Sequence, residues 1–313
     1  MKYQELIDIK KSSRSLRTLE TEKKNRTLLT LNDLLLKHQN EILAANQQDL
    51  DLYKTSNKYT PAFADRLRLT PERLSSMRES LRQVAALPDP VGEVVEVRAL
   101  TQGPELKKIR SPLGVIFMIF ESRPNVITEA FSLAFKAGNG IILRGGRESL
   151  TTAKVLYELI ARALNENAVA PAVFWGITDP DRSLSDWLMQ QNKFIDVLIP
   201  RGGDALIEYV TEHSNIPLIK NDRGLCHLYV HCDADFKMAL EILENAKTQR
   251  PGVCNAIETL LVDHEIANTF LRQAYARLAP HEVEWHVCAN SLDILNSSPR
   301  VFLASPNTFN TEY

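Results

Sequence analysis

The sequence predicts an α/β protein with parallel sheets, divided into two domains, and two observations carry this prediction. From Pro112 onward, short apolar runs alternate with helix-like stretches, and alternating strands and helices form parallel sheets covered by helices. The chain has 313 residues, a length that favours two domains. Its share of hydrophobic residues, 44%, is ordinary for a globular protein that buries a sizeable core without metals or disulfides.

The first ninety residues show the periodicity of amphipathic helices. Their apolar residues recur at helical spacing with charges between them, at Leu16, Leu19, Leu28, Leu31, Leu34, Leu35 and Ile42. Thr70, Pro71 and Glu72 predict a further helix start, with an N-cap, a proline in the first helical position and an acid in the first turn. We expect this helix to end near Pro88.

The segment Glu93–Arg110 predicts a β-hairpin. Glu93–Leu100 alternates and is rich in valine, Gly103 and Pro104 form a turn, and Glu105–Arg110 returns as the second strand. The apolar runs that follow predict buried strands, and they are Leu113–Phe120, Gly140–Leu143, Val173–Trp175, Ile195–Ile199, Leu228–Val230 and Ile257–Val262. Helical segments such as Leu150–Leu164 and Asp235–Ala246 lie between these runs.

Two glycine pairs follow predicted strands, and they are the candidate phosphate contacts. The sequence contains no G-x-G-x-x-G and no G-x-x-x-x-G-K-[ST], so neither a conventional dinucleotide turn nor a P-loop is expected. Instead, Arg144 precedes Gly145 and Gly146, and Arg201 precedes the pair Gly202 and Gly203. Glycines let backbone N–H groups approach a phosphate, and a helix N-terminus favours an anion. A plain strand-to-helix turn with a solvated arginine has the same residues, so the residues alone leave both interpretations open.

The run Cys226–Cys232 contains two cysteines and two histidines, which raises the question of a metal site. Tyr229 and Val230 at its centre favour a strand, in which the two cysteines point to one face and the histidines to the other. At ~3.3 Å per residue the cysteines then lie roughly 20 Å apart. We therefore expect packing residues here and no metal site.

Cys254 has a different setting. It follows a helical stretch, Pro251 and Gly252, and it precedes a strand, so it is expected on a loop. Lys247 and Arg250 are close in sequence and would lower the pKa of its thiol. A loop cysteine with cationic neighbours is a candidate nucleophile, although an unreactive thiol fits the same pattern.

Charge and targeting signals restrict the partners. The formal net charge is −2, which gives no basic surface for nucleic acid. The N-terminal segment has no apolar core of a secretory signal. No run reaches the ~18 apolar residues of a membrane span. The four cysteines show no disulfide framework. We therefore expect a cytoplasmic protein that contacts neither nucleic acid nor membrane.

Four stretches of the sequence together carry a resemblance to a known family. They are Pro112–Ile116 through Glu121–Val126, Lys136–Asn139 with Ile142–Gly146, Leu198–Gly203, and Asn245–Pro251 with Cys254–Thr259. In this order they resemble the gamma-glutamyl phosphate reductase family, which belongs to the aldehyde dehydrogenase superfamily. The resemblance covers essentially the whole chain. It implies an aldehyde dehydrogenase-like fold, with an NADP-binding domain of an open parallel sheet over residues 1–193 and a smaller α/β catalytic domain from residue 194 to residue 313. The hairpin of residues 93–110 would belong to an arm that joins subunits into a homo-oligomer.

The resemblance also implies a reaction. L-glutamyl 5-phosphate and NADPH would give L-glutamate 5-semialdehyde, phosphate and NADP in proline biosynthesis. Cys254 would be the nucleophile, and Asn125 would help to hold the oxyanion, although the asparagine of ordinary aldehyde dehydrogenases aligns nearer Glu121. Arg144, Gly145, Gly146, Gly202 and Gly203 would contact the cofactor. Arg223 and Arg250 are the candidate ligands of the substrate carboxylate, and each is otherwise a surface charge.

The sequence departs from this pattern at two places. The glutamate base of ordinary aldehyde dehydrogenases aligns with Asn221, which suits a reductase that must not hydrolyse its thioester. The chain ends at Tyr313 in what resembles a mid-domain stretch of the family, so the catalytic domain is expected to be truncated. The truncation leaves open an inactive remnant that binds nucleotide without turnover. A separate alternative is an acylating enzyme that uses a CoA thioester, and the segment around Arg250 and Cys254 argues against it.

Overall fold

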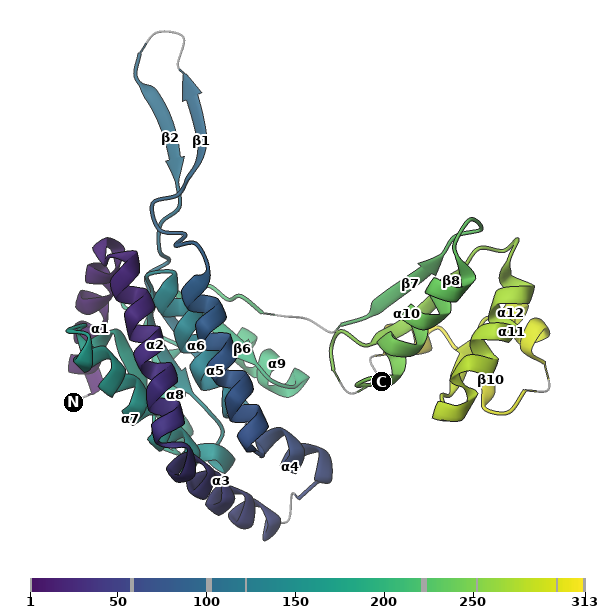
Figure 1. Ribbon diagram of the computed structural model, residues 1–313, viewed down its shortest axis with the longest axis horizontal. Coiled ribbons are helices and arrows are strands. Elements are labelled where there is room, and N and C mark those ends of the chain that lie inside the picture. The colour runs from purple at the N-terminus through teal and green to yellow at the C-terminus, as the bar shows by residue number, and fades with distance from the viewer. Residues whose placement is uncertain are drawn as a thin grey trace. The chain divides into compact units, whose positions relative to one another are not determined.

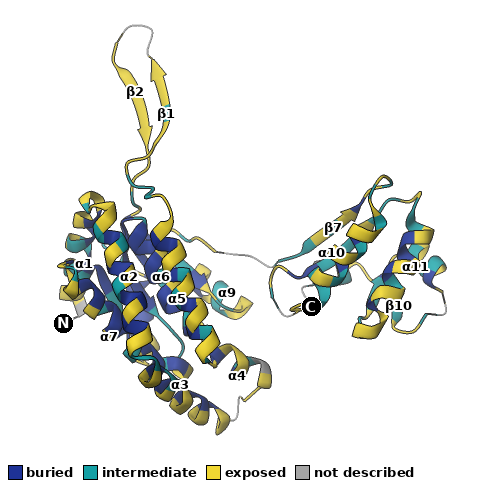
Figure 2. Cartoon of the chain, viewed as in Figure 1, coloured by how far each residue is buried: buried dark blue, intermediate teal, exposed yellow. Residues whose placement is uncertain are grey.

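The computed structural model divides into two compact units, residues 1–221 and residues 222–313 (Figure 1). The structure describes residues 2–56, 59–99, 103–121, 123–220, 224–251, 253–296 and 298–311. Each unit has a hydrophobic core of its own, shown by the dark blue residues of Figure 2. The two units are described separately below.

The first unit is built on a four-stranded parallel sheet. Its strands run in the order β5-β4-β3-β6, with the bounds β3 Val115–Phe120, β4 Gly140–Arg144, β5 Phe174–Gly176 and β6 Val197–Arg201. Leu198 also pairs in parallel with Leu218, which extends the sheet beyond β6. The chain moves outward from β3 to β4 and β5 and then crosses to the other side of β3. The strand order therefore reverses between β3 and β6.

Helices cover both faces of this sheet. The helices of the unit are α1 Lys2–Ser15, α2 Thr21–Lys37, α3 Gln39–Lys54, α4 Pro61–Leu67, α5 Pro71–Ala86, α6 Asn125–Lys136, α7 Leu150–Glu166, α8 Arg182–Leu188 and α9 Asp204–His213. Short 3-10 turns lie at Leu16–Thr18, Arg147–Ser149 and Pro171–Val173. Alternate residues of β3 point to opposite faces, so Ile116 and Phe120 pack with α2, α5, α6 and α7, whereas Val115 and Phe117 pack with α1, α8 and α9.

Local sequence signals predicted the start and the end of α5 correctly. The Thr70 hydroxyl accepts a hydrogen bond from the backbone N–H of Arg73 at 3.2 Å, and Pro71 opens α5. This is the predicted cap, which satisfies one of the N–H groups that have no partner within the helix. The helix ends at Ala86, ahead of Pro88, as predicted.

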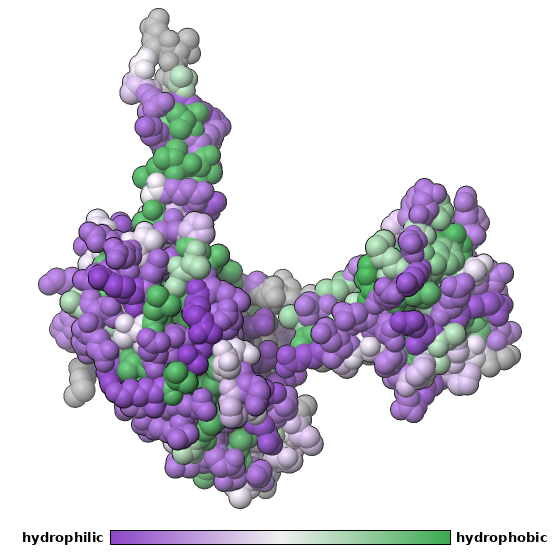
Figure 3. Space-filling view, in the orientation of Figure 1, coloured by the Kyte–Doolittle hydropathy of each residue, from purple (hydrophilic) through white to green (hydrophobic). Residues whose placement is uncertain are grey.

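The predicted hairpin is present and is largely exposed. β1 Val94–Ala99 pairs antiparallel with β2 Glu105–Ile109, and the residue Leu100 lies outside the described residues. Val94, Val95, Val97, Leu106 and Ile109 are each about half exposed. Figure 2 shows the hairpin in yellow, and Figure 3 shows hydrophobic patches along it. A two-stranded hairpin of this kind is only marginally stable in water by itself.

The second unit contains two small parallel pairs of strands. β7 Cys226–Val230 pairs with β8 Ile257–Val262, and β9 Trp285–Val287 pairs with β10 Val301–Leu303. Its helices are α10 Phe236–Thr248, α11 Ala267–Leu278 and α12 Ala289–Leu295, with 3-10 turns at Ala279–His281 and Thr308–Asn310. The core between α10, α11 and the strands centres on Val230, Leu243, Ile257 and Phe270. The α/β class predicted for both parts of the chain is therefore present.

The division between the units differs from the sequence-based domain boundary at residues 193 and 194. β6 follows that boundary but pairs with β3 over the register Ile116 to Val197 through Phe120 to Arg201. Strand pairing of this length joins β6 and α9 to the first unit, so the division falls after residue 221. The earlier boundary was an expectation from the family resemblance, and the periodicity of a single strand carries no information about which sheet the strand joins.

Among the described residues, no helix combines the length and the apolar character that crossing a membrane requires.

Candidate active site and cofactor cleft

A cleft of about 400 Å³ opens at the carboxyl ends of the first unit's strands. Its walls come from the ends of β3 and β4, the turn after β4, and helices α8 and α9. The strand order reverses beside β3, and open parallel sheets bind their ligands at such a switch point. The cleft is therefore the candidate cofactor site of the first unit.

Three arginines gather around this cleft. Arg144 ends β4, Arg147 follows the glycine pair, and Arg182 begins α8. The Nε of Arg144 is buried and has no hydrogen-bond partner in the structure. Burial first, and then the like charges of Arg182 and Arg147, lowers the pKa of the Arg144 guanidinium. A buried N–H without a partner among like charges fits an anionic ligand, because an anion would satisfy the donor and relieve the repulsion.

The turn between β4 and α7 differs from the expectation in one respect. The N-terminus of α7 was expected to favour an anionic ligand, but the buried carboxylate of Asp49 on α3 occupies it. Asp49 accepts from the N–H groups of Thr151 at 3.0 Å and Thr152 at 2.8 Å, and from the Thr152 hydroxyl at 2.6 Å. The protein thus supplies the anion of this helix N-terminus itself. The arginines around the cleft remain the groups available to a phosphate.

The second glycine pair is tied to the end of β3. The carboxylate of Glu121 accepts a hydrogen bond from the N–H of Gly203 at 3.0 Å. A β-carbon at Gly202 would lie 2.7 Å from the Glu121 carboxyl carbon and 2.7 Å from Leu206 Cδ2. A larger residue at 202 would therefore push the Glu121 and Leu206 side chains out of their present positions.

Asn125 lies elsewhere in the first unit. It opens α6 and lines a second cleft of about 390 Å³ together with Arg123, Met118 and Arg201. Its Nδ2 donates to Glu129 Oε1 at 3.0 Å, one helical turn along. The structure brings Arg144 and Gly146 together with Glu121 in the first cleft, and it places Asn125 in the second.

Cys254 lies in the second unit, in the turn that leads into β8, and its side chain is exposed. This is the loop position that the sequence predicted. The turn is closed by a hydrogen bond from Ala256 N–H to the Val253 carbonyl at 2.9 Å. The thiol of Cys226, on β7, donates to the Cys254 carbonyl at 3.5 Å. All four cysteines are free thiols.

The cations near Cys254 in sequence have different positions in space. Lys247 Nζ donates to the Ile257 carbonyl at 2.9 Å and contacts the Glu258 carboxylate at 3.2 Å. Its charge is therefore paired with a carboxylate, and this differs from the expectation that it acts on the thiol. Arg250 is exposed at the end of the α10 segment. Arg223 and Asn221 lie outside the described residues.

His231 and Cys232 also differ from the expectation. The sequence placed them on opposite faces of one strand, but β7 ends at Val230 and both residues lie in the turn that follows. Strand alternation no longer applies there, and the Cys232 Sγ lies 3.5 Å from His231 Nδ1. Within the strand itself the alternation holds, since His227 and Tyr229 are exposed and Val230 is buried.

Sequence reasoning missed several residues of the cleft. Arg147 follows the glycine pair directly, so the neighbouring motif was a usable signal for it. Arg182, Asp186 and Tyr209 carry no local motif, and they meet only because α8 and α9 flank the same strand ends. Tyr209 donates to Asp186 at 2.9 Å across the two helices.

Comparisons with known proteins agree with this architecture. The model for the aldehyde dehydrogenase family matches residues 7–287. A gamma-glutamyl phosphate reductase from Shewanella denitrificans is 43% identical over 284 residues, which cover 91% of this chain and 67% of that protein. One from Nitratiruptor is 41% identical over 304 residues, covering 97% of this chain and 73% of its own. The crystal structure of gamma-glutamyl phosphate reductase from Thermotoga maritima superposes with a TM-score of 0.91 at 35% identity, over 100% of this chain and 74% of that one.

The chain therefore belongs to the aldehyde dehydrogenase family, a family of nicotinamide-dependent enzymes. Within this family the similarity is specific, because relatives named gamma-glutamyl phosphate reductase match 91% and 97% of the chain at 43% and 41% identity. A further crystal structure of that name, from Saccharomyces cerevisiae, superposes with a TM-score of 0.66 at 29% identity, over 96% of this chain and 75% of its own. The chain spans 67% to 75% of the length of these four proteins.

Proposed function

We propose that this chain catalyses the NADPH-dependent reduction of L-glutamyl 5-phosphate to L-glutamate 5-semialdehyde, the reductive step of proline biosynthesis. The observation that carries the proposal is the identity of 43% to a gamma-glutamyl phosphate reductase over 91% of the chain. The exposed thiol of Cys254, in the turn before β8, supplies the nucleophile that such a reaction needs.

In the proposed reaction, the Cys254 thiolate attacks the carbonyl carbon of the acyl phosphate. A sulfur–carbon bond forms, the carbon–oxygen bond to phosphate breaks, and phosphate leaves with the electron pair. When bound, NADPH supplies the hydride that reduces the resulting thioester. The tetrahedral product then collapses to the aldehyde and returns the thiolate. By the family resemblance Asn221 would stand at the position of the usual glutamate base, and an asparagine there would not activate water against the thioester.

The cleft at the ends of β3, β4 and β6 is the proposed cofactor site. Arg144, Arg147 and Arg182 would bind the phosphate groups of NADP, with Gly145 and Gly146 admitting the nucleotide close to the backbone. The unpartnered Nε of Arg144 supports this assignment. Guanidinium groups bind phosphate in bidentate fashion, so three of them favour a cofactor with an extra phosphate, NADP over NAD. The turn at Gly202 and Gly203 would hold the carboxylate of Glu121, which lines the same cleft, through the N–H of Gly203.

The remaining assignments concern the substrate. Asn125 would donate to the oxyanion, for which its amide would have to leave Glu129. Arg223 and Arg250 would bind the carboxylate of the substrate, since arginine matches that group in charge and geometry. The exposed hairpin β1–β2 would be part of a homo-oligomer interface, because its apolar side chains are about half exposed.

The reverse reaction tests the proposal most directly. NADP reduction is followed with L-glutamate 5-semialdehyde and phosphate, using the chain, its Cys254→Ala variant and Cys288→Ala as a matched control at another exposed cysteine. We expect phosphate-dependent turnover that Cys254→Ala abolishes and Cys288→Ala retains. Folded protein without turnover, but with thermal stabilisation by NADPH, would instead identify a nucleotide-binding chain without activity. Turnover with coenzyme A in place of phosphate would identify an acylating enzyme.

The hairpin has a separate test. Val97→Thr combined with Leu106→Thr removes apolar surface and keeps residues that suit a strand. We expect the mass in solution, measured by light scattering, to fall to that of a smaller assembly. Lys107→Gln on the same strand is the control, and an unchanged mass in the double variant would refute the role of the hairpin.

A further inference from the structure

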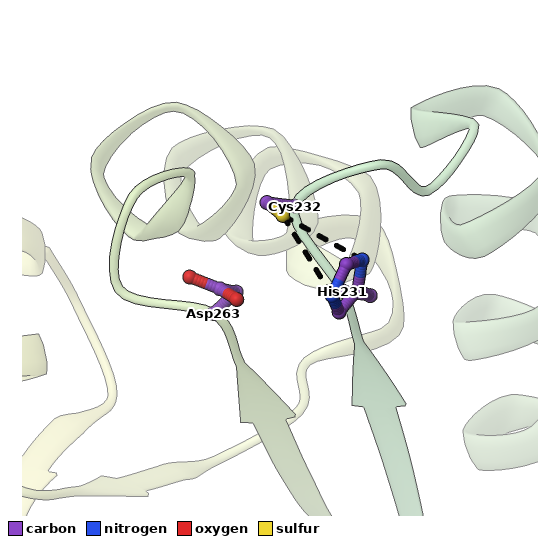
Figure 4. A group of neighbouring side chains, drawn as sticks. All are labelled: His231, Cys232 and Asp263. Atoms are coloured by element: carbon purple, nitrogen blue, oxygen red, sulfur yellow. Dashed lines mark hydrogen bonds between the residues drawn. The ribbon is translucent and has the colours of Figure 1, made fainter.

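The ends of β7 and β8 hold a cluster of three side chains that the proposed reaction does not use. His231 and Cys232 follow β7, and Asp263 follows β8 (Figure 4). The N–H of Asp263 donates to the Val230 carbonyl at 2.9 Å, which continues the ladder between the strands. The strand pairing therefore fixes the two segments beside each other, although 30 residues separate them in sequence.

The three side chains face one another closely. The Cys232 Sγ lies 3.5 Å from His231 Nδ1 and 3.8 Å from Nε2. One ligand atom each from His231, Cys232 and Asp263 can be chosen so that all three atoms lie within 4.8 Å of one another. Figure 4 shows the imidazole and the thiol on one segment, with the carboxylate on the neighbouring one.

The carboxylate of Asp263 is held in place from both sides. Its Oδ1 accepts from the N–H of Glu265 at 3.1 Å, and its Oδ2 accepts from the Tyr229 hydroxyl at 3.4 Å. Side chains fixed by such outer contacts bind a metal better than side chains that must first be ordered. The thiol and the carboxylate are both partly buried, whereas the imidazole is exposed.

The surroundings of the cluster are acidic. The Asp233 carboxylate lies 3.5 Å from His231 Nδ1. Burial first, and then the negative charges of Asp233, Asp263 and Glu265, raises the pKa of the Cys232 thiol. The same negative charges attract a cation.

We propose that His231, Cys232 and Asp263 bind one divalent transition-metal ion of the zinc class, with Asp233 or water as the fourth ligand. Zinc takes nitrogen, sulfur and oxygen ligands at about 2.0–2.3 Å in tetrahedral geometry, which sets ligand atoms roughly 3.5 Å apart. The separation of Sγ from Nδ1 already has this value. Magnesium and calcium prefer oxygen ligands alone, so the thiol excludes them as the favoured ion.

Cobalt(II) titration of the full chain under reducing conditions tests this proposal. Thiolate ligation of cobalt gives a charge-transfer absorption that counts the bound equivalents, and zinc then displaces the cobalt. We expect Cys232→Ser to lose one equivalent and Asp263→Asn to bind at least about 10-fold more weakly. Cys288→Ser, at an exposed cysteine elsewhere in the same unit, is expected to keep that equivalent. Zinc is also expected to raise the unfolding temperature of the wild-type chain and not that of Cys232→Ser.

The cobalt count is taken as a difference between variants, so binding at Cys254 or Cys226 does not obscure it. The proposal is overturned if Cys232→Ser keeps every equivalent, or if Cys288→Ser loses one equivalent as Cys232→Ser does. It is independent of the proposed reaction, since none of its readouts involves turnover.

Discussion

A β-carbon at Gly224 would overlap the carbonyl oxygen of Cys254. The segment that enters β7 therefore runs against the backbone of the proposed nucleophile, and only glycine permits this approach. The Cys226 thiol, two residues further along, donates to the same carbonyl. The position of Cys254 thus depends on the strand beside it as well as on its own turn.

Gly224→Ala is expected to lower the proposed activity by about 100-fold, because a displacement of the order of 1 Å is enough for a loss of that size. Turnover in the reverse reaction measures the effect, and thermal unfolding shows whether the second unit stays folded. Leu261→Thr, at an exposed position of β8, is the control and should keep its activity. Full activity in Gly224→Ala would contradict this prediction, because it would show that the added β-carbon does not move the Cys254 backbone enough to affect turnover.

Arg182→Gln is expected to raise the KM for NADPH by roughly 10-fold and to leave the KM for NADH almost unchanged. A charge-assisted hydrogen bond is worth about 1.5–3 kcal/mol, and only NADPH carries the extra phosphate. The variant should be no less stable than the wild type, because it removes a like charge that faces Arg144.

Lys154→Gln removes the same charge from an exposed position of α7 and is the matched control. Steady-state kinetics with both nucleotides at two salt concentrations decide the result. An equal rise of the KM for NADPH and NADH would place Arg182 at a phosphate that both cofactors share, and would contradict its role in selecting NADPH.

Asp49→Ala is expected to destabilise the chain by about 2–4 kcal/mol. The change removes the cap of α7 and leaves the N–H groups of Thr151 and Thr152 without their partner. Urea unfolding measures the loss. Asp51→Ala on the same helix is the control, because the Asp51 side chain is 60% exposed and its ion pair with Lys54 is exposed as well. Equal losses in the two variants would contradict the capping role.

The sequence predicted those features that neighbouring residues determine. The strands β3 to β8, the cap at Thr70 and the turn that holds Cys254 all follow from local periodicity and turn residues. The glycine pairs were also found, because each directly follows a strand.

Features made by distant residues were not predictable in this way. Asp49 reaches Thr152 across 103 positions, and Arg182 meets Arg144 only when α8 packs beside β4. The pairing of β6 with β3 placed the unit boundary later than expected. The pairing of β7 with β8 brings Asp263 beside His231 and Cys232. The alternation of residues within one strand could not predict this contact, because it does not show which strands pair.

The pair Lys24 and Asp89 gives the stability a defined pH dependence. The Lys24 side chain is fully buried, and its Nζ lies 2.8 Å from Asp89 Oδ2. Burial opposes ionisation of Asp89, but hydrogen bonds from Lys24, the N–H of Val91 and the Thr21 hydroxyl together lower its pKa below the usual value. Since the folded pKa is lowered, the pair contributes stability above the unfolded pKa of about 3.9, and this contribution is lost as the pH falls through the folded pKa.

Asp89→Asn is therefore expected to destabilise the chain by about 3–5 kcal/mol at pH 7, because it leaves the buried Lys24 without its counter-charge. The difference from the wild type should begin to shrink below about pH 4, where Asp89 of the unfolded chain takes up a proton, and it should be lost as the pH falls through the lower folded pKa. Urea unfolding of both chains from pH 7 to pH 2 measures this change, with Asp51→Asn at the exposed pair as the control. A difference that stays constant over the whole range would mean that packing at residue 89, and not its charge, supports the fold, because packing does not titrate.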